Sequence, residues 1–362
     1  MNSFAIYRLP HGQRFTLVGQ TSGEARRLGS FGELGRDAGF ALAPFEMSAA
    51  CPLLLIRPDV VRSFDASEAA SCRSLIAEGL QVVRQHADDK PSGCGSERDD
   101  YHADFARFYD ELASRRLLKV VLSRCSRIDI AGHDSADPFR LFLEACRRYP
   151  RLFVALVATP QSGLWLAATP EILLDGQSGQ WRTIALAGTM QLAAHELQGE
   201  GEQARWSAKN IEEQRLVATY IKERLQPLCS SLSEEGPRTV RAANLVHLRS
   251  DFSFTLLNKV RVGDGVSVLP PTPAVCGLPQ DEARRFILAH EHTPRRYYSG
   301  FMGPVGLDDA THLYVSLRCM QVMAASCRLY AGGGLLRDSI EEEEWQETEA
   351  KLQTMKQLFQ LR

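Results

Sequence analysis

Residues 101–124 read YHADFARFYDELASRRLLKVVLSR, and the hydrophobic pattern changes once within this stretch. In the first part, Phe105, Phe108 and Leu112 recur at the spacing of one helix face. The last part, 117–124, is short, apolar and contains β-branched residues, as buried strands do. The pattern therefore predicts a helix that leads directly into a strand.

The same interpretation along the chain gives more strands and two long helices. Strands are expected at residues 152–158, 164–168, 182–186, 296–302, 312–319 and 327–331, and helices at 204–226 and 341–359. The strands come in groups, and strand and helix do not alternate regularly. This arrangement favours an α+β fold of layered sheets and helices over a doubly wound parallel sheet.

The chain is expected to divide into three parts. Residues 1–86 contain short apolar segments separated by turn residues, which predicts an N-terminal β-rich lobe packed on the main body. The stretch 87–100 is polar and rich in turn formers, which predicts a linker. Residues 101–362 then form the larger domain.

Composition excludes several classes of protein. The formal net charge of -2 gives no electrostatic reason to expect nucleic acid or an anionic membrane as a partner. The N-terminus has no continuous apolar signal region, and the apolar runs are far shorter than a membrane span. Nine cysteines without a CxxC pair indicate neither a zinc ribbon nor a disulfide framework. We therefore expect a cytoplasmic protein with reduced thiols.

Lys119 and Glu171 are the first candidate site residues. Lys119 interrupts an apolar strand, so it either lies on a solvent-facing edge, as the rarity of buried lysines favours, or is buried and functional. Burial disfavours the charged form of lysine and makes it a usable general base. Glu171 follows a strand and Pro170, so it lies either exposed in a turn or directed into a cleft.

Two acidic clusters could bind a cation. Glu213 lies in the first long predicted helix, and Glu344, Glu347 and Lys351 share one face of the C-terminal helix. The simpler interpretation is a solvated helix face, because acids in a first helical turn also suit the helix dipole. Carboxylates from two helices would, however, form a hard-oxygen site suited to magnesium.

These residues lie within a series of motifs that resembles the chorismate-utilising enzymes. That family includes isochorismate synthases, salicylate synthases and the large subunits of anthranilate and aminodeoxychorismate synthases. The matching segments are Lys119–Arg124 (KVVLSR), Ala168–Leu174 (ATPEILL), Leu186–Thr189 (LAGT), Ser207–Glu213 (SAKNIEE), Asn244–Leu248 (NLVHL), Pro271–Gly277 (PTPAVCG), Tyr298–Gly300 (YSG), Ser316–Arg318 (SLR), Tyr330–Gly334 (YAGGG) and Glu344–Thr348 (EWQET). The resemblance implies a layered α/β/β/α sandwich of two large antiparallel sheets flanked by helices, with residues 101–362 as the chorismate-binding catalytic domain.

The resemblance also indicates a branch of the family. Members that add water carry lysine where this chain has Lys119, whereas those that add ammonia carry glutamine, and water needs a base. Members that stop at isochorismate tend to have alanine at the position of Ala274, and those that go on to lose pyruvate have threonine or serine. An isochorismate synthase is therefore expected, with a role in menaquinone rather than siderophore synthesis. The alternatives are a salicylate synthase and an isochorismate synthase of a siderophore pathway.

Site roles follow from the resemblance residue by residue. Lys119 is implied to deprotonate the attacking water and Glu171 to protonate the leaving hydroxyl. Glu213 and Glu344, supported by Glu347, are implied to hold Mg²⁺. The residues implied to bind chorismate are Gly188, Thr189, His247, Ala274, Tyr298, Arg318, Gly332, Gly334 and Lys351.

Three positions depart from the family pattern: Asn210 replaces an acid, Gln214 a histidine and Gly333 an alanine. These departures leave open a non-enzymatic chorismate-binding subunit, which the presence of the implied base, acid and metal ligands disfavours. For His247 a purely structural role also remains open. A monomer or weak homo-oligomer is expected.

Overall fold

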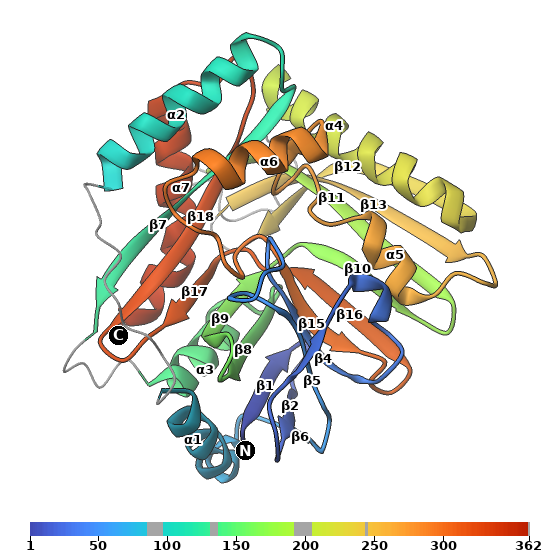
Figure 1. Cartoon of the computed structure of the whole chain (residues 1–362), viewed down its shortest axis with the longest axis vertical. Helices are drawn as coiled ribbons and strands as arrows, with labels where there is room; N and C mark the ends of the chain where they lie inside the picture. Colours follow the sequence, from blue (N-terminus) through green and yellow to red (C-terminus); the bar gives the residue numbers. More distant parts are fainter. Residues whose placement is uncertain (85–96, 131–136, 192–204, 243–244, 361–362) are drawn as a thin grey trace.

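The computed structural model describes residues 1–362 except 85–96, 131–136, 192–204, 243–244 and 361–362. Two nine-stranded sheets lie face to face and carry helices on their outer faces (Figure 1). All the pairings between neighbouring strands that the structure describes are antiparallel. The predicted α+β sandwich of two large antiparallel sheets is confirmed.

The strand order of each sheet mixes distant parts of the chain. The first sheet contains, in spatial order, β14 (Gly277–Leu278), β7 (Lys119–Asp129), β18 (Ser326–Leu335), β17 (Cys319–Val322), β9 (Gly163–Thr169), β8 (Phe153–Thr159), β1 (Ser3–Arg8), β2 (Phe15–Gln20) and β6 (Val60–Phe64). The second contains β12 (Cys229–Ala242), β13 (Leu245–Leu256), β11 (Gln180–Gln191), β10 (Ile172–Gln177), β16 (Ala310–Val315), β15 (Phe301–Val305), β4 (Gly39–Ala43), β5 (Leu53–Ile56) and β3 (Arg26–Leu28).

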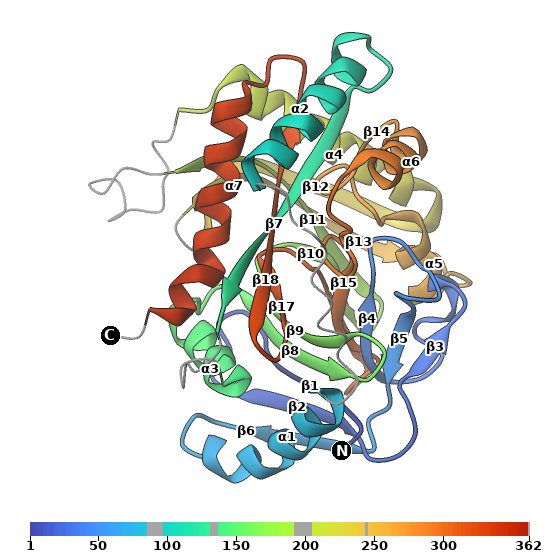
Figure 2. The same cartoon turned by 60° about the vertical axis from the view of Figure 1, so that its left-hand side comes forward.

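Helices cover the two outer faces. They are α1 (Ala69–Arg84), α2 (Glu97–Ala113), α3 (Pro138–Arg148), α4 (Ala208–Leu225), α5 (Val262–Val268), α6 (Gln280–His290) and α7 (Glu341–Lys356), with 3-10 turns at Phe31–Glu33, Gln226–Leu228 and Gln357–Phe359. Helices α1, α2, α3, α6 and α7 contact the first sheet, and α4 and α5 contact the second, which α7 also touches at β11. Figure 2 shows α7 running alongside β7 and β18. No helix in the described part of the chain is both long enough and apolar enough to cross a membrane.

Strand β8 shows why the sequence contains continuous apolar runs. Its residues Phe153, Ala155 and Val157 pack in the core between the two sheets. The alternate residues, from Val154 to Ala158, pack in a second core beneath α1, α3 and α7. Because successive side chains of a strand point to opposite faces, a strand covered on both sides is apolar at every position.

The first 64 residues supply strands to both sheets. β1, β2 and β6 extend the first sheet beyond β8, and β3, β4 and β5 extend the second beyond β15. The division between an N-terminal lobe and a larger domain therefore does not coincide with a boundary between sheets. Most of the predicted linker, 87–100, lies outside the described residues. Its last four residues form the first turn of α2, where acidic side chains favour helix.

Two predicted strands need correction. The strand expected over residues 296–302 begins only at Phe301, because Arg296 and Ser299 have φ of 54° and 62°, outside the extended region. The strand expected over residues 312–319 ends at Val315, and a new strand of the other sheet begins at Cys319.

Candidate active site

Two of the places where the chain crosses from one sheet to the other lie next to each other, and each of these two carries a predicted site residue. Glu171 lies between β9 of the first sheet and β10 of the second, and Arg318 between β16 of the second and β17 of the first. The Ala168 amide donates to the Arg318 carbonyl at 3.1 Å, and the Val315 amide donates to the Glu171 carbonyl at 2.9 Å. The crossings therefore place an acid and an arginine at one pocket between the sheets.

That pocket gathers most of the residues expected from the sequence. Of the predicted site residues, it is lined by Glu171, Gly188, Thr189, Glu213, His247, Ala274, Tyr298, Arg318, Gly332, Gly334 and Lys351. Lys119 lies behind its wall, next to Glu213. Glu344 and Glu347 line a neighbouring opening that shares Thr189 with the pocket. The structure thus brings all of the predicted side chains to one region, while their roles stay predictions.

Glu171 has the properties of a proton donor. Its side chain is buried at the pocket, and burial raises the pKa of the carboxyl to about 8, although three neighbouring cationic side chains act in the opposite direction. The carboxyl is therefore largely protonated at neutral pH and can act as a general acid.

Lys119 is fully buried, so the edge position favoured by base rates does not apply. Its Nζ lies 3.0 Å from Glu213 Oε1. Burial opposes ionisation of Glu213, but the charge of Lys119 outweighs it and holds the pKa of Glu213 below its usual value. The second Glu213 oxygen accepts a hydrogen bond from the Gly188 amide at 3.1 Å. Gly188 has φ of 71° at a bulge in β11, a conformation that suits glycine.

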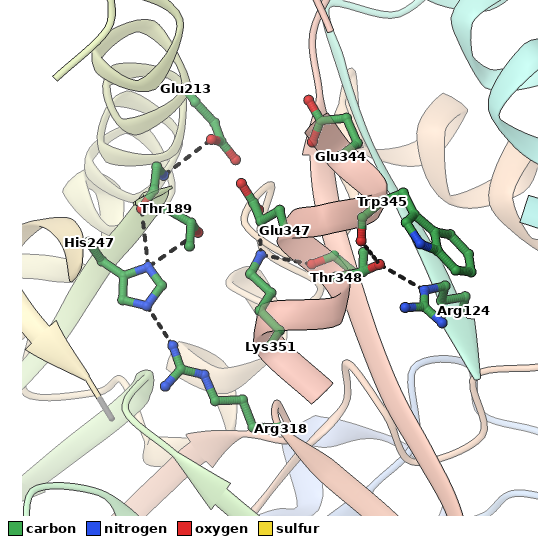
Figure 3. Close-up of polar contacts among 12 residues, drawn as sticks. Arg124, Thr189, Glu213, His247, Arg318, Glu344, Trp345, Glu347, Thr348 and Lys351 are labelled. Atoms are coloured by element: carbon green, nitrogen blue, oxygen red, sulfur yellow. Dashed lines mark hydrogen bonds and ion pairs between the residues drawn. The ribbon is translucent and has the colours of Figure 1, made fainter. Parts of the chain in front are cut away.

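His247 fixes the position of Arg318. Its Nδ1 lies 3.1 Å from the Gly188 carbonyl oxygen, to which it donates, and its Nε2 lies 2.5 Å from Arg318 Nη2, from which it accepts (Figure 3). Burial, followed by the charge of Arg318, lowers the pKa of His247 well below its usual value. The neutral ring therefore orients the arginine, and because His247 also lines the pocket, its role in substrate binding stays a prediction.

Lys351 and Tyr298 both approach the glycine-rich strand β18 at Gly332. Lys351 Nζ donates to the Gly332 carbonyl at 2.8 Å and contacts Glu347 Oε1 at 2.7 Å. A Cβ on Gly332 would lie 2.7 Å from the Tyr298 hydroxyl. On Gly334 a Cβ would collide with Glu213 Oε1 and lie 3.0 Å from Lys119 Cε. The two glycines therefore allow Tyr298, Glu213 and Lys119 to lie directly against the backbone of β18.

The donor set around Gly333 and Gly334 fits a magnesium ion. Figure 3 shows Glu213 from α4 and Glu347 from α7 extending toward one another, with Glu344 on the same face of α7. A Cβ on Gly333 would lie 3.2 Å from Glu344 Oε2 and 3.6 Å from Glu347 Oε1, so this backbone forms a cradle for the carboxylates. Carboxylate oxygens are the protein ligands that Mg²⁺ prefers.

Lysines balance the charge of these three glutamates. Glu213 contacts Lys119, Glu344 contacts Lys209, and Glu347 contacts Lys351. Among the residues that the structure describes, no three acidic, histidine or cysteine side chains lie close enough together to hold a metal as they stand. Binding of an ion would therefore require at least one of these contacts to change.

A cluster behind α7 was not singled out from the sequence. Arg124 of β7 stacks over Trp345, with its guanidinium carbon 3.7 Å from the ring centroid, and donates from Nε to Thr348 Oγ1 at 2.7 Å (Figure 3). Its guanidinium also contacts Glu349. Arg124 is itself buried. The signal was present, because Arg124 and Trp345 lie within the quoted motifs. The two residues are more than 200 positions apart in the sequence, so their contact could be recognised only from the structure.

Two of the departures from the family pattern, Gln214 and Asn210, can be placed in the structure. Gln214 is buried and donates from Nε2 to Ser250 Oγ of β13 at 2.8 Å, so it supports α4 against the sheet. Asn210 lines the neighbouring opening, and its Cβ lies 3.2 Å from the position of a Cβ on Gly188. Neither residue is among those that line the main pocket.

The family described as a chorismate binding enzyme matches residues 68–360, which is most of the chain. The chain belongs to the chorismate-binding enzyme family. Among members of the family it is 34% identical over 253 residues to the isochorismate synthase MenF of Escherichia coli K12, an alignment that covers 69% of this chain and 58% of MenF. It is 32% identical over 270 residues to the isochorismate synthase DhbC of Bacillus subtilis 168, covering 72% of this chain and 67% of DhbC.

The family fold is also shared in three dimensions. The structure of the menaquinone-specific isochorismate synthase MenF from Escherichia coli superposes with a TM-score of 0.77 and 25% sequence identity, and covers 99% of this chain and 88% of that chain. In the sequence alignment this chain spans less than two thirds of the length of MenF.

Proposed function

We propose that the protein is a magnesium-dependent isochorismate synthase, which interconverts chorismate and isochorismate. The observation that carries the proposal is a largely protonated buried acid, Glu171, in a pocket that also presents Arg318 and Lys351. The buried Lys119 lies behind the pocket wall, against Glu213. The relatives named as isochorismate synthases support the same activity.

The reaction needs a base and an acid. Lys119 takes a proton from the water that adds to C2 of chorismate, and Glu213, 3.0 Å away, stabilises the resulting ammonium. Glu171 gives its proton to the hydroxyl at C4, which leaves as water. One water enters and one leaves, so the product is an isomer of the substrate. Each role typically contributes about 10²–10⁴-fold in rate.

The remaining groups bind the anionic substrate. Arg318, oriented by His247, supplies paired donors suited to the enolpyruvyl carboxylate. Mg²⁺ held by Glu213 and Glu344 with support from Glu347 would balance the charge of the ring carboxylate. Lys351 is held by Glu347 and the Gly332 carbonyl, and it adds positive charge at the pocket.

The test is to incubate the purified protein with chorismate and MgCl₂ and to separate the products by liquid chromatography. Isochorismate should form, and added isochorismate should return to chorismate. Lys119→Ala should abolish turnover while circular dichroism shows an intact fold. Near-normal turnover by that variant would remove Lys119 from the mechanism.

Other products would identify the alternatives. Salicylate and pyruvate in equal amounts would show a salicylate synthase. The family resemblance disfavours that activity, because members that stop at isochorismate tend to have alanine at the position of Ala274, which lines the pocket. Chorismate that binds without being consumed would show a non-enzymatic binding subunit. Either outcome would overturn the proposed activity.

We further propose a role in menaquinone synthesis, supported by the similarity to MenF. Expression in a bacterium that lacks its menaquinone-pathway isochorismate synthase should restore menaquinone, whereas rescue of siderophore production alone would favour the siderophore pathway. The cytoplasmic location and the monomeric or weakly associated state stay predictions, which fractionation and size-exclusion chromatography test.

A further inference from the structure

The contact between Lys209 and Glu344 joins the first turns of two helices that are distant in sequence. Lys209 follows the N-cap Ser207 of α4, whose hydroxyl accepts from the Asn210 amide at 3.2 Å. Glu344 lies in the first turn of α7 and is 1% exposed. The capped start of α4 therefore holds a cation directly against a buried carboxylate.

Lys209 differs from the other two lysines that contact the proposed metal ligands. Lys119 is fully buried against Glu213 and is the proposed base. Lys351 is held in place by both Glu347 and the Gly332 carbonyl. The Lys209 side chain retains 22% exposure and lines the opening next to the main pocket, so it has a path to solvent.

Glu344 needs a cationic partner. Its carboxylate is 1% exposed, and Lys209 Nζ contacts it directly. A buried carboxylate without a partner is strongly unfavourable. Lys209 and a divalent ion would each satisfy this requirement, and their like charges oppose simultaneous close contact with Glu344.

We propose that Lys209 is an internal counter-ion, which holds Glu344 until a divalent ion displaces it and so sets the affinity of the site for the ion. This inference rests on the proposed function insofar as it requires Glu344 to be a metal ligand. In the exchange, the ammonium moves into the neighbouring opening and the ion takes its place against the carboxylate. No covalent bond changes.

The test measures ion binding rather than turnover. Chelator-treated full-length protein is titrated with Mn²⁺, and free ion is counted by electron paramagnetic resonance. Lys209→Met should tighten Mn²⁺ binding by about tenfold or more, because a competing charge is removed. Lys209→Arg should stay close to the wild type. Lys222→Met, which removes an exposed charge from the same helix, is the matched control and should change nothing.

Thermal melting gives a second readout. In EDTA, Lys209→Met should melt below the wild type, and Mg²⁺ should raise its melting temperature more than it raises that of the wild type. Adding Glu344→Gln to Lys209→Met should restore stability in EDTA, because no buried charge is then left unpaired. If Lys209→Met does not fold alone, recovery of folding in this double variant supports the proposal and failure to recover overturns it.

The results separate this proposal from the proposed activity. Unchanged or weaker Mn²⁺ binding by folded Lys209→Met overturns the counter-ion role, even if the wild type makes isochorismate. Tighter binding by Lys209→Met together with a wild type that leaves chorismate unchanged supports the counter-ion role and overturns the activity.

Discussion

At the residue scale, Glu171 gives the proposed reaction an alkaline limit. Its pKa is raised to about 8 by burial, and only the protonated carboxyl can donate to the leaving hydroxyl. As pH rises through about 8 the acid ionises, so activity should fall about tenfold per further pH unit. A pH–rate profile measures this limb. Glu171→Gln should lower the rate by about 10²-fold or more. The residual activity of this variant should no longer fall as the pH rises through about 8.

Gly334 and Gly333 differ in what a methyl group would meet. A Cβ on Gly334 would overlap Glu213 Oε1, a carboxylate held on both sides by Lys119 and the Gly188 amide. A Cβ on Gly333 would have its nearest neighbour, Glu344 Oε2, at 3.2 Å, which is a tight contact but not an overlap. Gly334→Ala should therefore abolish isochorismate formation in a folded protein, and Gly333→Ala should retain most of it. Equal activity in the two variants would contradict the need for close approach at Gly334.

The burial of Lys119 shows the limit of prediction for single residues. The sequence places a lysine in an apolar strand, and base rates then favour an exposed edge. The buried position depends on Glu213 as a charge partner and on the missing side chain of Gly334, which are about 100 and 200 residues away. The hydrophobic pattern around Lys119 carries no information about either residue. The family motifs supplied what local physics could not.

At the scale of elements, Arg124 determines how α7 sits on β7. It is buried, stacks on Trp345 and bonds to Thr348. Arg124→Ala should lower the free energy of unfolding by about 2–3 kcal/mol and weaken Mg²⁺ binding, because α7 carries Glu344 and Glu347. Arg127→Ala in the same strand removes an exposed pair with Asp129 and should cost about 0.5 kcal/mol or less.

Chemical denaturation and Mn²⁺ titration of both variants provide the measurement. If Arg124→Ala loses stability while Mn²⁺ affinity stays normal, the arginine stabilises the fold without positioning the carboxylates. If Arg127→Ala loses as much stability as Arg124→Ala, the stacked cluster has no special role.

Elements were predictable where their hydrophobic pattern was long and regular. The strand at 152–158 and the helices ending near 226 and 359 were found within a few residues. The strand predicted at 312–319 was wrong in a way that matters, because residues 316–318 carry the chain between sheets. Arg318 adopts φ of 47° there, and a run of strand-forming residues does not reveal a left-handed position. The part of the site that depends on this crossing therefore required the structure.

At the scale of the whole molecule, the two sheets should unfold together. Strands β1 and β4, from the first 43 residues, pair with β8 and β15 in the middle of the chain and near its end. Circular dichroism and tryptophan fluorescence should therefore report one coincident transition in denaturant. Two separated transitions would contradict this expectation.

A chain that begins at residue 101 should not fold. It would leave β8 without β1 and β15 without β4, and would expose apolar sheet faces that are buried in the intact protein. Near-UV circular dichroism and size-exclusion chromatography measure the outcome. A compact, native-like product would restore the predicted division into an N-terminal lobe and an independent catalytic domain.

The positions of the site residues along the chain also limit recombination between the genes of related proteins. Lys119, Glu171, Arg318 and Glu344 come from four separate stretches and meet only in the folded protein. A recombination breakpoint anywhere between the first and last of them joins a base from one parent to carboxylates from another. Hybrids should therefore remain active only when both parents pack β7 against α7 in the same way.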